Sequence, residues 1–342
     1  MPTLRSHLIF EMARGVRAFL GFEAGLVRGD APTPAYGDVE SIRRQTAEKE
    51  KEIKRLKERI AANGVRSGGM NPENIIWIFG VARVGSTWLG SMMGEIEGHT
   101  VWNEPLVGAL FGGFYYGRAA HRGGKHGILG GPEEKRSRAI RAFVLASAHE
   151  KFPEVSGDGY LVVKEPNGSN GAPLLAQALP ESRMIFLVRD PRDVVSSGIG
   201  AASEGGWYAK ARKRRRGVSK EQSPDDIVEA RATRYVQYIG KSREAYEAHE
   251  GPKVLVRYEE LRTDTLGTMK RIYSELGISM DEHEVARAVR KYSWENIPEE
   301  KKGPDKFYRK ATPGGWREDL TPKQAQTVER ITAPFIEEFY SA

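Results

Sequence analysis

Short apolar runs, each followed by glycine or polar residues, recur along the chain from residue 75 onward. Each run is too short for a helix but suits a strand that is buried on both faces of a parallel sheet. Longer segments with apolar residues at helical spacing separate the runs. This alternation predicts an α/β fold, a three-layer α/β/α domain with a central parallel sheet. The predicted strands are residues 75–79, 100–102, 160–163, 184–188 and 253–256.

Helix signals mark the segments between these strands. The clearest start is Asp190-Pro191-Asp193, which offers a capping side chain, a proline at the first helical position and an acid in the first turn. In contrast, the glycine-rich residues 111–132 predict a mobile segment. The predicted helices are residues 88–96, 139–149, 190–199, 225–249, 266–276 and 283–292, and a last helix that begins at Thr321 and Pro322.

The first 70 residues have a different character, and we expect them to form an N-terminal helical extension and linker to a domain of residues 71–342. Residues 1–30 mix apolar and arginine side chains, which predicts an amphipathic helix that packs on protein or, less favoured, contacts a membrane surface. Residues 39–62 predict a charged helix with a thin apolar seam, either solvated on the surface or in a homodimer contact. No charge-free run in residues 1–30 is long enough to span a bilayer.

A glycine-bounded loop follows the first predicted strand. Gly80 and Gly85 have the spacing of the phosphate-binding signature G-x-x-x-x-G-K-[ST], and Thr87 is in place. Ser86 stands where the signature has lysine, so Arg83 is the nearest cation. Such a loop directs backbone N–H groups and a helix N-terminus at one point. The sequence therefore predicts an anion site for a phosphate-like ligand other than a magnesium-bound triphosphate; packing alone is the alternative.

The strand at residues 184–188 also leads into a helix with polar residues at the junction. Arg189 lies at the end of the strand and Ser197 about two turns into the helix, where both can contact one phosphate. A purely structural pair of Arg189 with a nearby aspartate is the alternative.

Together these two segments resemble sulfotransferases that use 3′-phosphoadenosine 5′-phosphosulfate (PAPS). The sequence R-x-G-[ST]-T-W is similar to the 5′-phosphosulfate loop of that family, and residues 184–199 resemble its 3′-phosphate motif. The resemblance implies a P-loop NTPase-like sulfotransferase fold and PAPS as sulfuryl donor, with Arg189 and Ser197 on the 3′-phosphate. The residues that it assigns to the first loop are Arg83, Gly85, Ser86, Thr87 and Trp88.

The resemblance also suggests a catalytic set at the ends of two strands. Glu104 follows the strand at 100–102, in a region where heparan-type and some bacterial members of the family carry a glutamate base. The chain therefore resembles a bacterial member of the glutamate-base type, since Pro166 fills the position of the histidine base. Lys164 and Arg83 would stabilise charge on the transferring group. Glu165 is a second candidate base, but strand alternation should turn it away from Lys164.

For Glu104 to act near neutral pH, we expect partial burial to raise its pKa. The resemblance further implies that Tyr258 lies near the adenine. Residues 298–315 resemble a loop that closes over the 3′-phosphate, with Arg309 as its best candidate ligand. The mobile segment at 111–132 would lie over the acceptor site.

The composition of the chain favours some classes of ligand over others, but it does not identify the acceptor of the sulfuryl group. The chain has no cysteine, which excludes disulfides and fits a cytoplasmic location, and its formal net charge of +7 favours an anionic ligand. The basic run at 210–216 is either a solvated loop or a capture site for an acidic acceptor. An acceptor hydroxyl or amine on a carbohydrate, lipid or small metabolite is expected, without a metal. The competing hypotheses are a nucleotide kinase, and a basic protein that binds nucleic acid or membrane surfaces, although no specific nucleic-acid motif is present.

Overall fold

The computed structural model describes residues 70–117, 127, 129–155, 159–202, 223–303, 310 and 312–341. The predicted helices at 1–30 and 39–62, the basic run at 210–216 and Arg309 lie outside the described residues, so the expectations for them remain predictions. Within the described ranges, no helix combines the length and the apolar character needed to cross a membrane.

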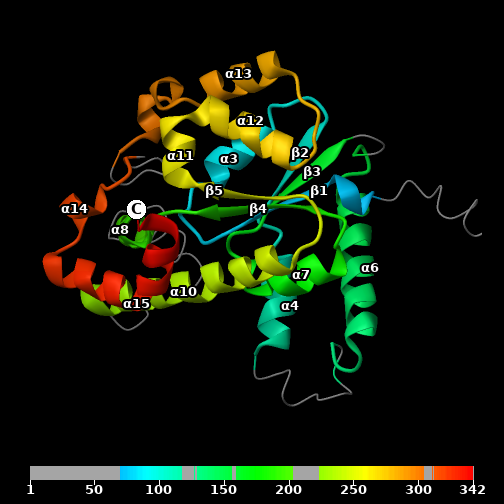
Figure 1. Cartoon of the computed structure of the whole chain (residues 1–342), viewed down its shortest axis with the longest axis horizontal. Helices are drawn as coiled ribbons and strands as arrows, with labels where there is room; N and C mark the ends of the chain where they lie inside the picture. The colour runs from blue at the N-terminus through cyan, green and yellow to red at the C-terminus, as the bar shows by residue number, and fades with distance from the viewer. Residues whose placement is uncertain are drawn as a thin grey trace, which may run out of the picture. The chain divides into compact units, whose positions relative to one another are not determined.

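A parallel sheet with the strand order β2-β3-β1-β4-β5 lies at the centre of the described domain (Figure 1). All neighbouring strands are parallel, so their carboxyl ends meet at one edge of the sheet. Every predicted strand is present. The bounds are β1 (Ile75–Phe79), β2 (His99–Asn103), β3 (Tyr160–Lys164), β4 (Arg183–Val188) and β5 (Lys253–Arg257).

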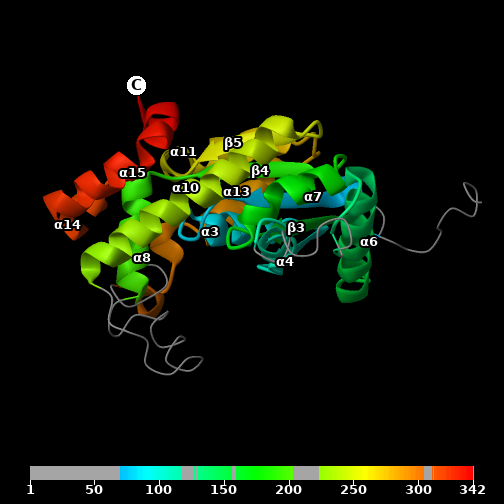
Figure 2. The ribbon, with the colours of Figure 1, turned by 90° about the horizontal axis from the view of Figure 1, so that it is seen from below.

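Helices cover both faces of this sheet, which confirms the predicted three-layer α/β/α fold (Figures 1 and 2). In the central strand β1, Ile76 and Ile78 belong to a core cluster that includes residues of α3 (Ser86–Met93). Ile75, Trp77 and Phe79 belong to a separate core cluster on the other face of the sheet. On the side of α3 lie α11 (Tyr258–Thr263), α12 (Thr265–Glu275) and α13 (Glu282–Lys291). On the other side lie α4 (Val107–Tyr115), α6 (Glu133–Lys151), α7 (Ala172–Ala178) and α10 (Pro224–Ala248), with α15 (Pro322–Tyr340) packed on α10.

Shorter elements complete the described part of the chain. The helix α8 (Pro191–Ala202) follows β4, and α14 (Trp316–Asp319) precedes α15. The 3₁₀ turns are η1 (Pro72–Asn74), η3 (Ser169–Gly171), η4 (Trp294–Asn296) and η5 (Glu299–Lys301).

The helix α4 corrects the prediction of a mobile segment over residues 111–132, because its residues to Tyr115 are helical. Its glycines are poor helix formers, but they allow the helix to lie very close to η3. A Cβ atom on Gly108 would lie 2.1 Å from the carbonyl oxygen of Gly168, and one on Gly112 would lie 2.7 Å from the Cα of Gly171. Close packing therefore outweighs the low intrinsic helix propensity of this segment.

Candidate functional site

The loop between β1 and α3 has the geometry of an anion site. Gly85 adopts φ 103°, which favours glycine, and a Cβ atom there would lie 2.5 Å from the ring of Tyr258. Ser86 begins α3 and is buried. The residue at the cap position, Gly85, has no side chain that could accept a hydrogen bond from the first N–H groups of the helix. The first N–H groups of a helix have no partner within the helix, so this turn can bind an anion.

Arg83, in this loop, meets the two residues predicted to bind the 3′-phosphate. Its Nε donates to Oγ of Ser197 at 3.1 Å, and its carbonyl oxygen accepts from Nη1 of Arg189 at 3.2 Å. The Arg189 guanidinium also lies over the ring of Tyr258, 4.2 Å from its centroid. Among the described residues, the buried Nε of Arg189 has no hydrogen-bond partner. The structure thus brings four predicted cofactor residues from three segments to one place.

Trp88 lies on α3 next to this cluster. Its indole N–H donates to the carbonyl oxygen of Tyr292 at 2.8 Å, and its ring meets that of Tyr258 edge to face with centroids 6.1 Å apart. The indole is therefore held in a fixed orientation beside Tyr258.

Glu104 and Lys164 meet at the carboxyl ends of β2 and β3. Nζ of Lys164 donates to Oε1 of Glu104 at 2.7 Å and to Oγ1 of Thr87 at 3.0 Å. The Lys164 side chain is 4% exposed, whereas that of Glu104 is 34% exposed. Nδ2 of Asn167 donates to Oε2 of Glu104 at 2.8 Å. This cluster joins the phosphate loop to a carboxylate that solvent, and hence an acceptor, can reach.

The pKa of Glu104 departs from the sequence-based expectation. Burial raises this pKa, but the hydrogen bonds from Lys164 and Asn167 outweigh burial and hold it below its ordinary value. The expectation of a raised pKa is therefore wrong for this arrangement. Glu104 is an ionised carboxylate at neutral pH, the form that can accept a proton.

Glu165 follows β3 and is completely buried, and its hydrogen-bond partners differ from those of Lys164. Its Oε2 accepts from the N–H of Leu106 and its Oε1 from the N–H of Gly108, each at 3.0 Å. Burial raises the pKa of Glu165 to about 7, although the same two hydrogen bonds lower it.

Backbone strain is concentrated in this region. Among the non-glycine residues that the structure describes, positive φ occurs at Arg83 (77°), Glu104 (50°) and Leu106 (61°). Non-glycine residues persist in this conformation only where the surrounding structure imposes it, which is common at functional sites. All three lie in the two segments that carry Arg83 and Glu104, two of the predicted catalytic residues.

Two residues gain contacts that the sequence did not indicate. Asn167 follows β3 in a turn, so its hydrogen bond to Glu104 depends on a loop geometry that the sequence pattern does not specify. Asp193 was predicted only as an acid at the start of a helix, yet its carboxylate accepts from the N–H of Gly314 at 2.7 Å and from that of Trp316 at 3.0 Å. Asp193 thereby ties the loop before α14 to the helix that carries Ser197.

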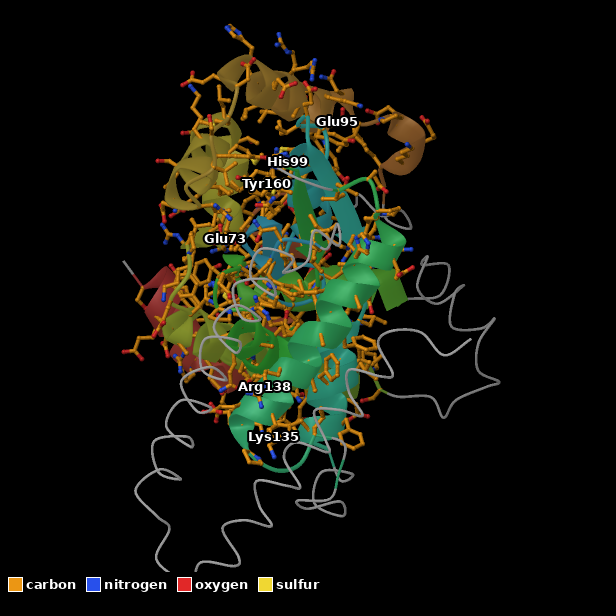
Figure 3. The ribbon with its side chains drawn as sticks, turned by 90° about the vertical axis from the view of Figure 1, so that its right-hand side faces the viewer. Glu73, Glu95, His99, Lys135, Arg138 and Tyr160 are labelled. Carbon is orange, nitrogen blue, oxygen red and sulfur yellow. The ribbon has the colours of Figure 1, made fainter. Side chains whose placement is uncertain are left out.

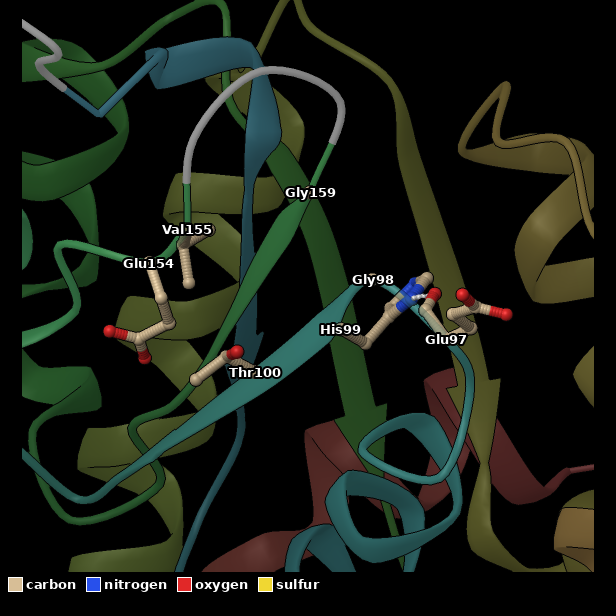
Figure 4. Close-up of a pocket in the computed structure, with 7 residues that line it drawn as sticks. All are labelled: Glu97, Gly98, His99, Thr100, Glu154, Val155 and Gly159. Carbon is tan, nitrogen blue, oxygen red and sulfur yellow. Dashed lines mark hydrogen bonds between the residues drawn. The ribbon is translucent and has the colours of Figure 1, made fainter.

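A hollow of about 530 Å³ lies at the opposite edge of the sheet, where β2 and β3 begin (Figure 4). His99 begins β2 and Tyr160 begins β3, and their rings lie 5.2 Å apart at this edge (Figure 3). The lining includes Glu97 and Glu154, and burial lowers the pKa of His99. This acidic hollow is therefore poorly suited to an anionic nucleotide, unlike the arginine and lysine cluster at the carboxyl ends of the strands.

Comparisons with known proteins point to one family. A family model described as "Sulfotransferase family" matches residues 76–282. The curated rat protein sulfotransferase 2A2 (Rattus norvegicus) is 24% identical over a match that covers 44% of this chain and 55% of the rat protein, so the chain spans about half the length of that relative.

Two sulfotransferases are among the solved structures to which the chain is similar. Mouse sulfotransferase SULT7A1, complexed with PAP, is 14% identical, with 82% of this chain and 89% of the mouse chain covered and a TM-score of 0.47. Sulfotransferase STF9 from Mycobacterium avium is also 14% identical, with 80% of this chain and 78% of the other covered and a TM-score of 0.47. At these identities and TM-scores, the likeness says nothing about the activity of this chain.

Proposed function

Because the chain belongs to the sulfotransferase family, we propose that it transfers a sulfuryl group from PAPS to a hydroxyl or amine of an acceptor. The observation that carries the proposal is the meeting of Arg83, Arg189 and Ser197. Arg83 lies in the turn between β1 and α3, Arg189 lies between β4 and α8, and Ser197 lies within α8. These two strand–helix junctions supply cationic and hydroxyl groups for two phosphate positions on one nucleotide.

The residues of the site divide between the two ends of this nucleotide. The N-terminus of α3, with Gly85, Ser86 and Thr87, suits the 5′-phosphosulfate, and Arg189 with Ser197 suits the 3′-phosphate. The buried Nε of Arg189, without a partner among the described residues, is a donor that a phosphate oxygen would satisfy. Trp88 and Tyr258 offer aromatic surface for the adenine. Arg309 stays a proposed ligand of the 3′-phosphate.

When bound, PAPS supplies the sulfuryl group and a leaving 5′-phosphate. The acceptor oxygen or nitrogen forms a bond to sulfur while the bond from sulfur to the 5′-phosphate oxygen breaks. Glu104 takes the proton of the acceptor, and its partly exposed, ionised carboxylate is suited to that role. Lys164, Thr87 and Arg83 stabilise the negative charge that develops around sulfur and the leaving oxygen, so no metal is needed.

The acceptor is proposed only by chemical class, as a hydroxyl or amine on a carbohydrate, lipid or small metabolite. The basic run at 210–216 would favour an acidic acceptor. Two further proposals concern segments outside the described residues: peripheral membrane contact through residues 1–30, and a homodimer through the helix at 39–62. A third is closure of residues 298–315 over the nucleotide. A cytoplasmic location remains a prediction from composition.

A thermal-shift panel tests the proposed function against its competitors. The ligands are 3′-phosphoadenosine 5′-phosphate (PAP), ATP with magnesium, and a short DNA duplex. We expect PAP to raise Tm most, because both of its phosphates find donors. Stabilisation by ATP with magnesium alone would favour a kinase, and stabilisation by the duplex alone would favour a nucleic-acid-binding protein. The Arg189→Ala variant is the matched control, since it should lose most of the response to PAP.

A further inference from the structure

The carboxylate of Glu165 holds the segment that carries Glu104. Leu106 occupies the cap position of α4, and its own side chain makes no capping hydrogen bond. Glu165, from the end of β3, accepts instead from the N–H groups of Leu106 and Gly108. A negative charge at the start of a helix is favourable because the unpaired N–H groups there carry partial positive charge.

The backbone of residues 104–106 is strained, so it requires contacts with other residues to keep its conformation. Glu104 and Leu106 have positive φ on either side of Pro105, whose ring fixes its own φ. The N–H of Glu104 donates to the carbonyl oxygen of Lys164 at 2.8 Å, which fixes one end of the segment. The carboxylate of Glu165 fixes the other end. Two consecutive residues of β3 and its turn thus determine where the Glu104 side chain lies.

The surroundings are shaped to admit this carboxylate. A Cβ atom on Gly168 would lie 1.8 Å from Oε1 of Glu165, so only glycine leaves room for it. The carbonyl oxygen of Glu165 accepts from Oγ of Ser169 at 3.0 Å, and the same Oγ accepts from the N–H of Gly80, at the start of the phosphate loop, at 3.0 Å. Glu165 is therefore connected to both halves of the site without facing the acceptor.

We propose that Glu165 is a positioning residue whose ionised carboxylate holds residues 104–108 in the strained backbone that brings Glu104 to Lys164 and Asn167. This inference rests on the proposed function, because it assigns Glu165 a role in the transfer that acts through Glu104. Glu165 does not itself contact the acceptor or the nucleotide in this role.

The charges around Glu165 make its hydrogen bonds to Leu106 and Gly108 depend on pH near neutrality. Burial is the main reason that the pKa of Glu165 rises to about 7. The charge of Glu104 also raises this pKa, whereas the hydrogen bonds from Gly108 and Leu106 and the charge of Lys164 lower it. The sequences of α4, η3 and α7 contain no Asp, Glu, Lys, Arg or His. From α10, Arg234 reaches Oδ1 of Asn167 at 3.4 Å. The hydrogen bonds from Leu106 and Gly108 lower this pKa, so protonation favours release of the segment when the carboxyl itself stays buried. Activity should therefore fall as the pH drops through about 7.

The decisive kinetic experiment compares Glu165→Gln, Glu104→Gln and the double variant. A glutamine at 165 turns an N–H₂ toward one of the two N–H groups, so we expect kcat to fall about 10- to 100-fold from misplacement of Glu104. The Kd for PAP should stay unchanged, and the loss of activity below about pH 7 should disappear. If Glu165 acts through Glu104, the double variant is no slower than Glu104→Gln alone. Multiplied losses in the double variant would overturn the proposal.

Hydrogen exchange of the unmodified protein tests whether the Glu165 carboxylate holds residues 104–108, without any assay of transfer. This measurement remains decisive if Glu165→Gln does not fold. After correction for the intrinsic pH dependence of exchange, protection of residues 104–115 should fall between pH 8 and pH 6, where about nine in ten carboxyls with a pKa of 7 are protonated. The control segment, α12, should keep its protection. Unchanged protection of residues 104–115 would overturn the proposal. Failure of PAP to bind would instead refute the proposed function and leave this measurement interpretable.

Discussion

Lys164 and Glu104 form an ion pair across the ends of β3 and β2, with Nζ of Lys164 2.7 Å from Oε1 of Glu104. The same ammonium group donates to Thr87, so two of its three donors are used within the described residues and one is left for an anionic ligand. The pair links charge stabilisation and proton removal, because the cation that would bind the transferring group also keeps the candidate base ionised.

Removal of the candidate base should affect chemistry more than binding. We predict that Glu104→Gln lowers kcat by about 10²–10⁴ while the Kd for PAP is retained, because a glutamine cannot take the acceptor proton. Steady-state transfer and titration with PAP measure the two quantities. Glu165→Gln is the comparison, with the smaller loss in kcat. The reverse ranking would make Glu165 the base.

Removal of the cation should change the pKa of the carboxylate. In the Lys164→Met variant, burial acts on Glu104 without the opposing hydrogen bond, so we predict that the pKa of Glu104 rises. A ¹³C NMR titration of the glutamate carboxyl carbons measures this, with the Glu104 resonance assigned by its absence in Glu104→Gln. An unchanged pKa would show that Lys164 does not control the ionisation of Glu104.

The buried carboxyl of Glu165 should make the free energy of unfolding depend on pH. Its pKa is raised from 4.5 to about 7, so between these values the folded protein holds a proton that the unfolded chain releases. The free energy of unfolding of the wild type, relative to that of Glu165→Gln, should therefore fall as the pH rises from 4.5 to 7 and then level off. Urea unfolding at several pH values measures the difference.

A second glutamate provides the control for this stability prediction. Arg141 holds the pKa of Glu181 below its ordinary value of 4.5. The stability that Glu181 contributes is present above pH 4.5 and is lost as the pH falls below it, so Glu181→Gln should differ from the wild type in the opposite sense and in a different pH range. Parallel curves for the wild type and Glu165→Gln would contradict the raised pKa.

The basic run at 210–216 is testable even though it lies outside the described residues. If it captures an acidic acceptor, replacement of Arg214, Arg215 and Arg216 by glutamine should raise the acceptor KM and reduce its dependence on salt. The Kd for PAP should barely change. Unchanged acceptor kinetics would make the run an ordinary solvated segment.

The strands were predictable because strands buried on both faces of a parallel sheet appear as uninterrupted apolar runs. Residues 75–79 match β1 in full, and the prediction of 100–102 falls inside β2. The helix α4 was missed because its glycines lower helix propensity, and its stability depends on close contact with η3, which lies about sixty residues later in the chain.

The site was predictable as far as strand order determines it. The register pairs Asn103 with Lys164, so the next residue, Glu104, follows at the same edge as the lysine. The contact of Asn167 and the two hydrogen bonds of Glu165 depend on a turn and on the start of α4, which local sequence did not indicate. The direction of the Glu104 pKa shift was mistaken for the same reason, since Asn167 adds to the effect of Lys164.

The most direct test of the account is the discrimination of the 3′-phosphate by calorimetric titration. The wild type and the Arg189→Ala and Ser197→Ala variants are each titrated with PAP and with adenosine 5′-phosphate. Loss of the charged contact from Arg189 should weaken PAP binding by about 1.5–3 kcal/mol, and loss of Ser197 by less, with little effect on adenosine 5′-phosphate. Equal losses for both nucleotides in Arg189→Ala would contradict the assignment of the 3′-phosphate site and, with it, the use of PAPS.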